Sequence, residues 1–192
     1  MKSFLLPIVL IISGCAVKPQ NYDLSTSSIL PPIAIKQNIP SIIVSDFKYE
    51  PNVRISQNTI SILGCLTCQS DGGTAGHVFD EPINKIVQTE VKAALKEVMI
   101  PSSKSSCVLN ATIHLAAWDV MDGDSTVDLT YVLSSSEQIK FIKRVRGYYD
   151  ASLFELHKTN RILAKASRNS VEKLVTDDEF LKIVNINCSK IQ

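Results

Sequence analysis

The chain carries almost no net charge, because 20 lysine and arginine residues stand against 19 aspartate and glutamate residues. A protein with this balance has no strong electrostatic field, which argues against nucleic acid as a partner. Aromatic residues are sparse, and no internal repeat is visible. Composition therefore points to an ordinary folded domain and away from a polyelectrolyte-binding protein.

The motifs that mark common enzyme classes are missing as well. The sequence has no G-x-S-x-G nucleophile elbow, no P-loop and no dinucleotide-binding fingerprint. It also has no zinc-finger spacing and no EF-hand loop. After the first residues, no segment holds the ~20 unbroken apolar residues that a membrane-spanning helix needs. We therefore predict a protein that is not an enzyme, with no catalytic residues, no metal and no cofactor.

The first 15 residues form the most informative segment. Lys2 precedes a short apolar run from Phe4 to Ile12, and small residues then lead directly to Cys15. This is the pattern of a secretory signal peptide. The stretch Ile12-Ser13-Gly14-Cys15 resembles the lipobox of bacterial lipoproteins, in which the signal is cut before a cysteine that then carries lipid. The resemblance implies a signal peptide over 1–14 and lipidation of Cys15.

A cysteine with several acyl chains would give a nearly permanent membrane anchor, because each buried methylene contributes ~0.8 kcal/mol. In the lipoproteins that this chain resembles, an acidic residue just after the cysteine often marks retention in the inner membrane. Here Ala16 and Val17 follow. The resemblance therefore implies the outer membrane, with the protein on its periplasmic side.

Residues 15–40 read as the lipidated cysteine followed by a flexible tether. Prolines at 19, 31, 32 and 40 remove backbone donors and disfavour helix. Ile33, Ile35 and Ile39 are more apolar than a bare linker needs, so this part either lies on the domain or waits for a partner. Residues 41–192 are then one domain's worth of chain.

Periodicity predicts most elements of that domain. Residues 41–47 read as a buried strand, and residues 50–79 as a weak strand or hairpin followed by a long glycine-containing loop. Apolar residues recur at helical spacing over 83–98, and Asp80 is expected to cap this helix, with Pro82 in its first turn. Residues 107–119, 126–133 and 139–149 read as three strands of a meander, the first two with clear alternation.

The tail allows two interpretations. Residues 153–174 fit either a hairpin turning at 158–160 or a helix, and we favour the helix. Thr176 is expected to cap a last helix, with Glu179 completing a capping box. The prediction is an α+β fold, with an antiparallel sheet of about four strands backed by the amphipathic helix and C-terminal helices. The element order, opening with the strand IIVSDF, resembles small periplasmic domains of the TolB N-terminal kind, and the ending SVEKLVTDDEFLKIVN is similar to uncharacterised envelope lipoproteins.

Four cysteines remain after Cys15. In an oxidising periplasm an even number favours disulfides. We favour Cys65–Cys68 and Cys107–Cys188 among three possible pairings. The alternative is a redox pair at Cys65-Leu66-Thr67-Cys68, although the flexible, slightly acidic loop that follows offers nothing to stabilise a thiolate.

Two polar features remain as candidates. Lys143, Arg144 and Arg146 form a basic strand that could face anionic lipid or glycan, although charge on an edge strand also protects against aggregation. His114 sits on a polar strand face, with Asp119 and Asp128 as conceivable partners. The acidic turn around Asp122 and Asp124 is read as an ordinary turn.

The function expected from these observations is that of a lipid-anchored envelope protein, acting as an interaction or assembly module with other envelope proteins. One alternative is a lipid- or glycan-binding accessory lipoprotein of a transport or secretion complex. The other is a thiol-redox protein that uses Cys65 and Cys68.

Overall fold

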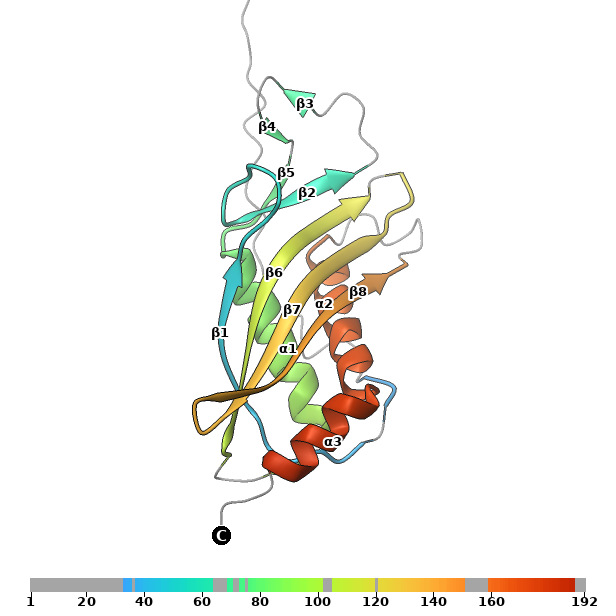
Figure 1. The fold of residues 1–192 in the computed structure, drawn as a ribbon. Coiled ribbons are helices and arrows are strands. Elements are labelled where there is room, and N and C mark those ends of the chain that lie inside the picture. Colours follow the sequence, from blue (N-terminus) through green and yellow to red (C-terminus); the bar gives the residue numbers. More distant parts are fainter. Residues whose placement is uncertain are drawn as a thin grey trace, which may run out of the picture.

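The computed structural model describes residues 33–35, 37–63, 69–70, 73–74, 76–101, 105–119, 121–150 and 159–188. The predicted signal peptide, the lipidation site Cys15 and the pair Cys65 and Cys68 lie outside these residues. Within them the chain forms a sheet covered on one face by helices (Figure 1).

The centre of the sheet is the predicted meander. It consists of β6 (Cys107–Asp119), β7 (Ser125–Ser135) and β8 (Gln138–Tyr149), which pair antiparallel in chain order. Ser136 and Glu137 join β7 to β8 with φ angles of 50° and 64°. Positive φ at both central residues is the geometry of a tight hairpin turn, whose twist matches that of the flanking strands.

The rest of the sheet corrects the sequence prediction, because the sheet is mixed and not purely antiparallel. β1 (Ile43–Tyr49) and β2 (Thr59–Leu63) both run parallel to β6 along the same edge, β1 beside its first half and β2 beside its end. The chain returns from β2 to β6 through a helix, and such a crossover permits parallel pairing where a tight turn does not.

The sheet also holds more strands than the four expected. Among the described residues, its path β5-β2-β6-β7-β8 has five strands, and β1 is a sixth that pairs with β6. β5 (Gly76–Val78) pairs antiparallel with β2 and lies in the stretch read from the sequence as a loop. The same stretch contributes β3 (Gln69–Ser70) and β4 (Gly73–Thr74), which form a separate two-stranded pair. Strands of two or three residues are too short to show an alternating pattern.

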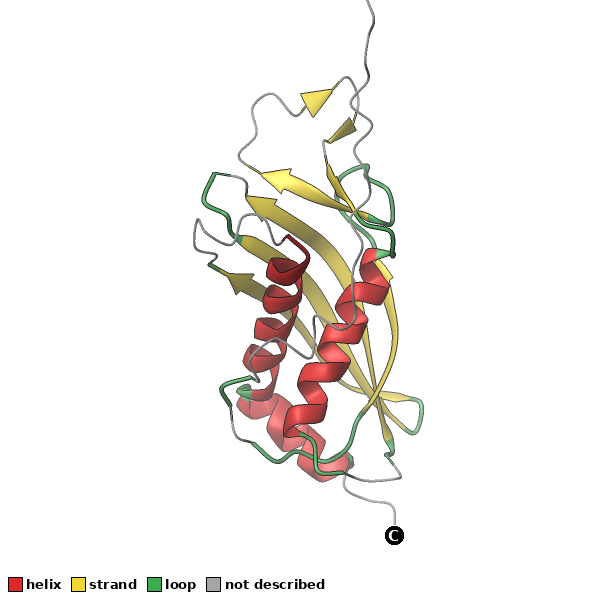
Figure 2. Cartoon of the chain, turned by 180° about the vertical axis from the view of Figure 1, so that it is seen from behind, coloured by secondary structure: helices red, strands yellow, loops and turns green. Residues whose placement is uncertain are grey.

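In the described part of the chain, three helices form a layer behind the sheet (Figure 2): α1 (Ile83–Val98), α2 (Thr159–Val175) and α3 (Asp178–Asn187). The helical interpretation of the tail is therefore confirmed from residue 159 on, against the hairpin, whereas residues 153–158 of the predicted helix lie outside the described residues. Asp177, and not Thr176, caps α3 by accepting a hydrogen bond of 2.8 Å from the Phe180 amide. Within the described residues, no helix combines the length and the apolar character needed to span a membrane.

Close packing of α2 against the sheet depends on one glycine. A Cβ at Gly147 of β8 would lie 2.0 Å from the carbonyl oxygen of Ala166. The facing side of α2 is correspondingly built of small buried residues, Ala166, Ser167 and Ser170 among them. The hydroxyls of Tyr131 and Ser170 form a hydrogen bond of 2.8 Å between sheet and helix. The helix layer thus sits directly on the backbone of β8.

Residues 33–35 and 37–39, which the sequence places in the tether, pack on the domain. We call these residues the strap. The strap buries Ile33 and Ile39 in the core, and Ile39 exchanges backbone hydrogen bonds of 2.9 Å with Val98 and Ile100. Of the two readings of its apolar residues, contact with the domain is the one that the structure shows. The described chain thus starts on the helix side of the molecule.

Candidate functional site

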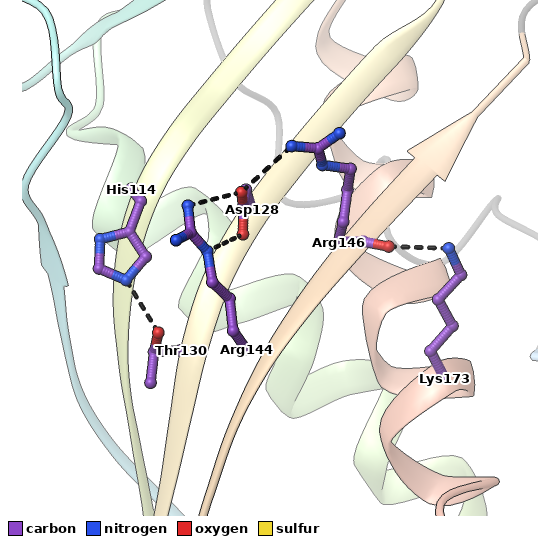
Figure 3. A network of polar contacts seen from close by, with 6 residues as sticks. All are labelled: His114, Asp128, Thr130, Arg144, Arg146 and Lys173. Carbon is purple, nitrogen blue, oxygen red and sulfur yellow. Dashed lines mark hydrogen bonds and ion pairs between the residues drawn. The ribbon is translucent and has the colours of Figure 1, made fainter.

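The face of the meander that points away from the helices is the strongest candidate for a functional surface. In Figure 3 it carries His114, Asp128, Arg144 and Arg146 on the side opposite to α1 and α2. No described helix covers it (Figure 1). We call this surface the open face. By strand register it is lined by the following side chains: Val108, Asn110, Thr112, His114, Leu115, Ala117, Thr126, Asp128, Thr130, Val132, Ser134, Ile139, Ile142, Arg144, Arg146 and Tyr148.

A charge cluster occupies the middle of the open face. Arg144 donates to both carboxylate oxygens of Asp128 through Nε and Nη2, each at 2.9 Å, and Arg146 approaches the same carboxylate through Nη2 at 3.5 Å. The Asp128 side chain is only 6% exposed, whereas those of Arg144 and Arg146 are 60% and 66% exposed. The carboxylate is therefore covered by its two arginines, which present their remaining N–H groups to the outside.

The electrostatics of this cluster are those of an ion pair. Burial alone would raise the pKa of Asp128, but the hydrogen bonds and positive charge of Arg144 and Arg146 outweigh it and hold the pKa below its usual value. The bidentate contact also fixes the plane of the Arg144 guanidinium. Asp128 therefore stays ionised and orients two outward-facing cations.

His114 belongs to the same face but not to the ion pairs. Its Nε2 atom lies 2.9 Å from the Thr130 hydroxyl across the β6–β7 pair (Figure 3). His114 sits where the register between β6 and β7 shifts, between Ile113 and Leu115. Of the partners considered from the sequence, neither Asp119 nor Asp128 forms a hydrogen bond with His114, since the partner is the neutral Thr130. A histidine without an orienting acid lacks the arrangement expected of a general base.

An apolar area adjoins the charge cluster towards the β7–β8 turn. Ile139 and Ile142 of β8 are 62% and 59% exposed, and Ile43 on β1 is 51% exposed. Register places Ile142 beside Val132 and Ile43 beside Val108. These five residues, Ile43, Val108, Val132, Ile139 and Ile142, form what we call the apolar end of the open face. Exposed isoleucines grouped on one face are a feature of interaction surfaces more than of solvated ones.

The basic strand predicted from the sequence is divided by the alternation of β8. Arg144 and Arg146 meet at Asp128 on the open face, whereas Lys143 faces the helix layer and pairs with Asp177 at the start of α3. The Lys143 pair also lowers the pKa of Asp177. On the outer side of β8, Lys173 donates to the Arg146 carbonyl at 2.8 Å, as Figure 3 shows. Only two of the three basic residues are thus available to one ligand.

Sequence reasoning missed two features here. It did not connect Asp128 with the arginines, although pairing the two strands as a hairpin places Asp128 opposite Arg146. It also did not identify the apolar end, because residues 139–149 were interpreted only as a strand with basic residues. The signal was present in the failure of β8 to alternate cleanly between apolar and polar residues.

Of the two disulfides favoured from the sequence, the one between Cys107 and Cys188 is present. The other pair, Cys65 and Cys68, lies outside the described residues. The acidic turn is tied down locally: Asp119 accepts a hydrogen bond from the Met121 amide at 2.9 Å, and the Tyr148 hydroxyl donates to Asp124. That bond raises the pKa of Tyr148 to about 12. The described residues hold no group of three metal-ligating side chains.

A second polar cluster lies between α1 and α2 and is structural. Arg168 of α2 is almost fully buried and forms an ion pair with Glu97. Its Nη1 atom also lies 3.9 Å from Oε2 of the buried Glu90. Glu97 also accepts a hydrogen bond of 2.7 Å from the Ile33 amide. Buried charges need partners, and these ones tie the two helices and the strap together.

Comparisons with known proteins bear on the fold alone. No family model matches the sequence, and no curated protein matches it either. The chain is similar in structure to protein XCC0632 from Xanthomonas campestris, described by family model DUF330, with a TM-score of 0.51 and 14% identity over 76% of this chain and 86% of that one. A PelC variant dodecamer from Paraburkholderia phytofirmans aligns with 16% identity over 69% of this chain and 92% of that one. Its TM-score of 0.25 is too low to indicate a shared fold.

Proposed function

We propose that this protein is a lipid-anchored, non-enzymatic lipoprotein of the outer membrane, which acts in the periplasm as an interaction and assembly module through its open face. The observation that carries the proposal is the composition of that face, where oriented arginines adjoin exposed isoleucines on a sheet surface that no described helix covers. Protein interfaces combine an apolar centre with arginine, and they are poor in lysine.

The position of the strap supports this arrangement. The Ile33 amide donates a hydrogen bond to Glu97 of α1, and the Ala34 amide donates one to Glu172 of α2. The chain therefore enters the domain on the helix side. If Cys15 carries lipid, residues 16–32 would reach ~50 Å when extended, at ~3 Å per residue. The anchor would thus attach to one side of the domain and leave the opposite side for a partner.

The proposal is tested by cross-linking the full-length protein in its own envelope and identifying what co-purifies. We expect at least one envelope protein in a fixed ratio to this chain, together with lipid on Cys15. A Cys15→Ser variant should lose membrane association and the complex with it. Recovery of this chain without any protein partner, in repeated cross-linking, would contradict the proposal.

A lipid- or glycan-binding accessory role is the second candidate, favoured by the exposure of Arg144 and Arg146. It predicts that the protein binds phosphatidylglycerol vesicles or purified envelope glycan and that changing both arginines to glutamate abolishes this. A thiol-redox role predicts instead that Cys65 and Cys68 react with a thiol probe after gentle reduction and that Cys65→Ser removes the activity.

A further inference from the structure

We propose that the open face binds an amphipathic helix of another envelope protein, with carboxylates that pair with Arg144 and Arg146 and apolar residues that cover the apolar end. This inference rests on the proposed function and adds to it the chemistry and the secondary structure of the partner. Three observations support it: the excess of positive charge on the face, the backbone hydrogen bonding of its strands and the spacing of its side chains.

The charge balance calls for an acidic partner. Over β6, β7 and β8, the open face holds two arginines against the single carboxylate of Asp128. Because Asp128 uses Nε and one Nη of Arg144, and a single Nη of Arg146, further N–H donors remain on both guanidiniums. Carboxylates suit such planar donors better than any neutral group does.

The backbone of the face favours a helix as the bound element. Inside the sheet, β7 is paired on both sides, by β6 and β8, and β6 is paired by β7 on one side and by β1 and β2 on the other, while β8 is an edge strand. A strand from a partner would need a free sheet edge, whereas a helix packs on a sheet face through side chains alone. At the β8 edge, the Arg146 carbonyl and the Tyr148 amide are already bound by Lys173 and Asn169 of α2.

The spacing along β8 fits the period of a helix. Ile142, Arg144 and Arg146 lie on the same face, and alternate strand residues are about 6.6 Å apart. Residues four apart in a helix are separated by about 6 Å along its axis. A partner helix that carries an apolar residue followed by acidic residues at two successive four-residue steps would therefore meet all three side chains.

Two other occupants are disfavoured by the same observations. Membrane surfaces attract clusters of about four to eight basic residues, and this face has two arginines partly neutralised by Asp128. A second copy of the chain, docked with two-fold symmetry, would bring the same arginine-rich surface against itself, and like charges across an interface are repulsive.

The experiment uses the full-length protein in native envelopes, with a photo-cross-linking amino acid placed either at Ile142 on the open face or at Lys182, an exposed residue of α3. The cross-linked peptide is located by mass spectrometry. We expect a protein segment with helical apolar periodicity and acidic residues, captured from position 142 and not from 182. Arg146→Glu should reduce the yield about tenfold or more, whereas the matched control Lys182→Glu should leave it unchanged.

A charge exchange completes the test. Changing the captured acidic residue to lysine should weaken binding to the original protein and restore it to the Arg146→Glu variant, which also shows that this variant is folded. Ile142→Ser, which leaves every charge in place, should reduce the yield too. Capture from 182 alone would overturn this inference and the part of the proposed function that assigns the interaction to the open face, while leaving the interaction role itself; protein capture from neither position would overturn that role as well. Cross-links from 142 to phospholipid, to a basic segment or to a second copy of this chain would each overturn the inference.

Discussion

Removal of the Cys107–Cys188 disulfide is expected to lower the free energy of unfolding by about 4 kcal/mol. The bond joins the first residue of β6 to the residue that follows α3, across a sequence separation of 81. Closing a loop of this length restricts the unfolded chain by ~4.5 kcal/mol at 25 °C in the chain-entropy model. Residual structure in the unfolded chain reduces that figure, while loss of the sulfurs of Cys107 and Cys188, residues that are 0% and 5% exposed, adds to the cost.

The assay is urea unfolding of the mature protein, of the same protein in reductant, and of a Cys107→Ala/Cys188→Ala variant. The dependence of stability on urea should also become steeper without the bond, because the unfolded chain exposes more surface. A Cys65→Ala/Cys68→Ala variant serves as the control and should keep the part of the stability that responds to reductant. A loss below about 1 kcal/mol in the Cys107 and Cys188 variant, with an unchanged slope, would refute the entropic argument.

Three further predictions follow from the packing and the charges. Gly147→Ala should cost about 3 kcal/mol in urea unfolding, since its Cβ would overlap the Ala166 carbonyl and push α2 away from the sheet; a loss below ~1 kcal/mol would contradict this packing. Asp177→Ala should cost about 1 kcal/mol through loss of the α3 cap, with less helix signal in circular dichroism, whereas Asp177→Asn should largely retain the cap. Asp128→Asn should flatten the acid side of the stability profile. Because Arg144 and Arg146 hold the folded pKa of Asp128 below the unfolded value of ~3.9, its contribution is present above about pH 4 and is lost as the pH falls through the lower folded pKa. An unchanged profile in the variant would rule out this role.

The elements that could be read from the sequence are those whose signal is local and long. The strand over 107–119 matches the structure at both ends, because it repeats its period several times. The helix with apolar residues over 83–98 is present for the same reason, although Pro82 and not Asp80 occupies its N-cap position. The meander followed from three such strands in succession. The pairing of Cys107 with Cys188 was favoured from the even number of cysteines and an expected oxidising compartment. The lipobox at Cys15 and the membrane location derived from it stay predictions.

Other features depend on which segments meet. The parallel pairing of β1 and β2 with β6 is decided by the path of the chain through α1, and nothing in a strand's own residues specifies the direction of its neighbour. The register shift after Ile113 moves Leu115 out of the fully buried set and Ala116 into it, although strict alternation places Leu115 inside. One residue of shift reverses every later side chain, and no local signal marks it.

The candidate site shows the same division. From the sequence alone, β8 was recognised as a basic strand, because its charges are adjacent in the chain. The tertiary structure separates these charges. Lys143 forms an ion pair with Asp177 on the helix side, whereas Arg144 and Arg146 both pair with Asp128 on the open face. Composition and period are properties of a segment by itself, and they determined the elements and their charges. Which face is covered depends on the packing of α2 and α3 from the far end of the chain, so only the folded protein decides which of those charges face outward together.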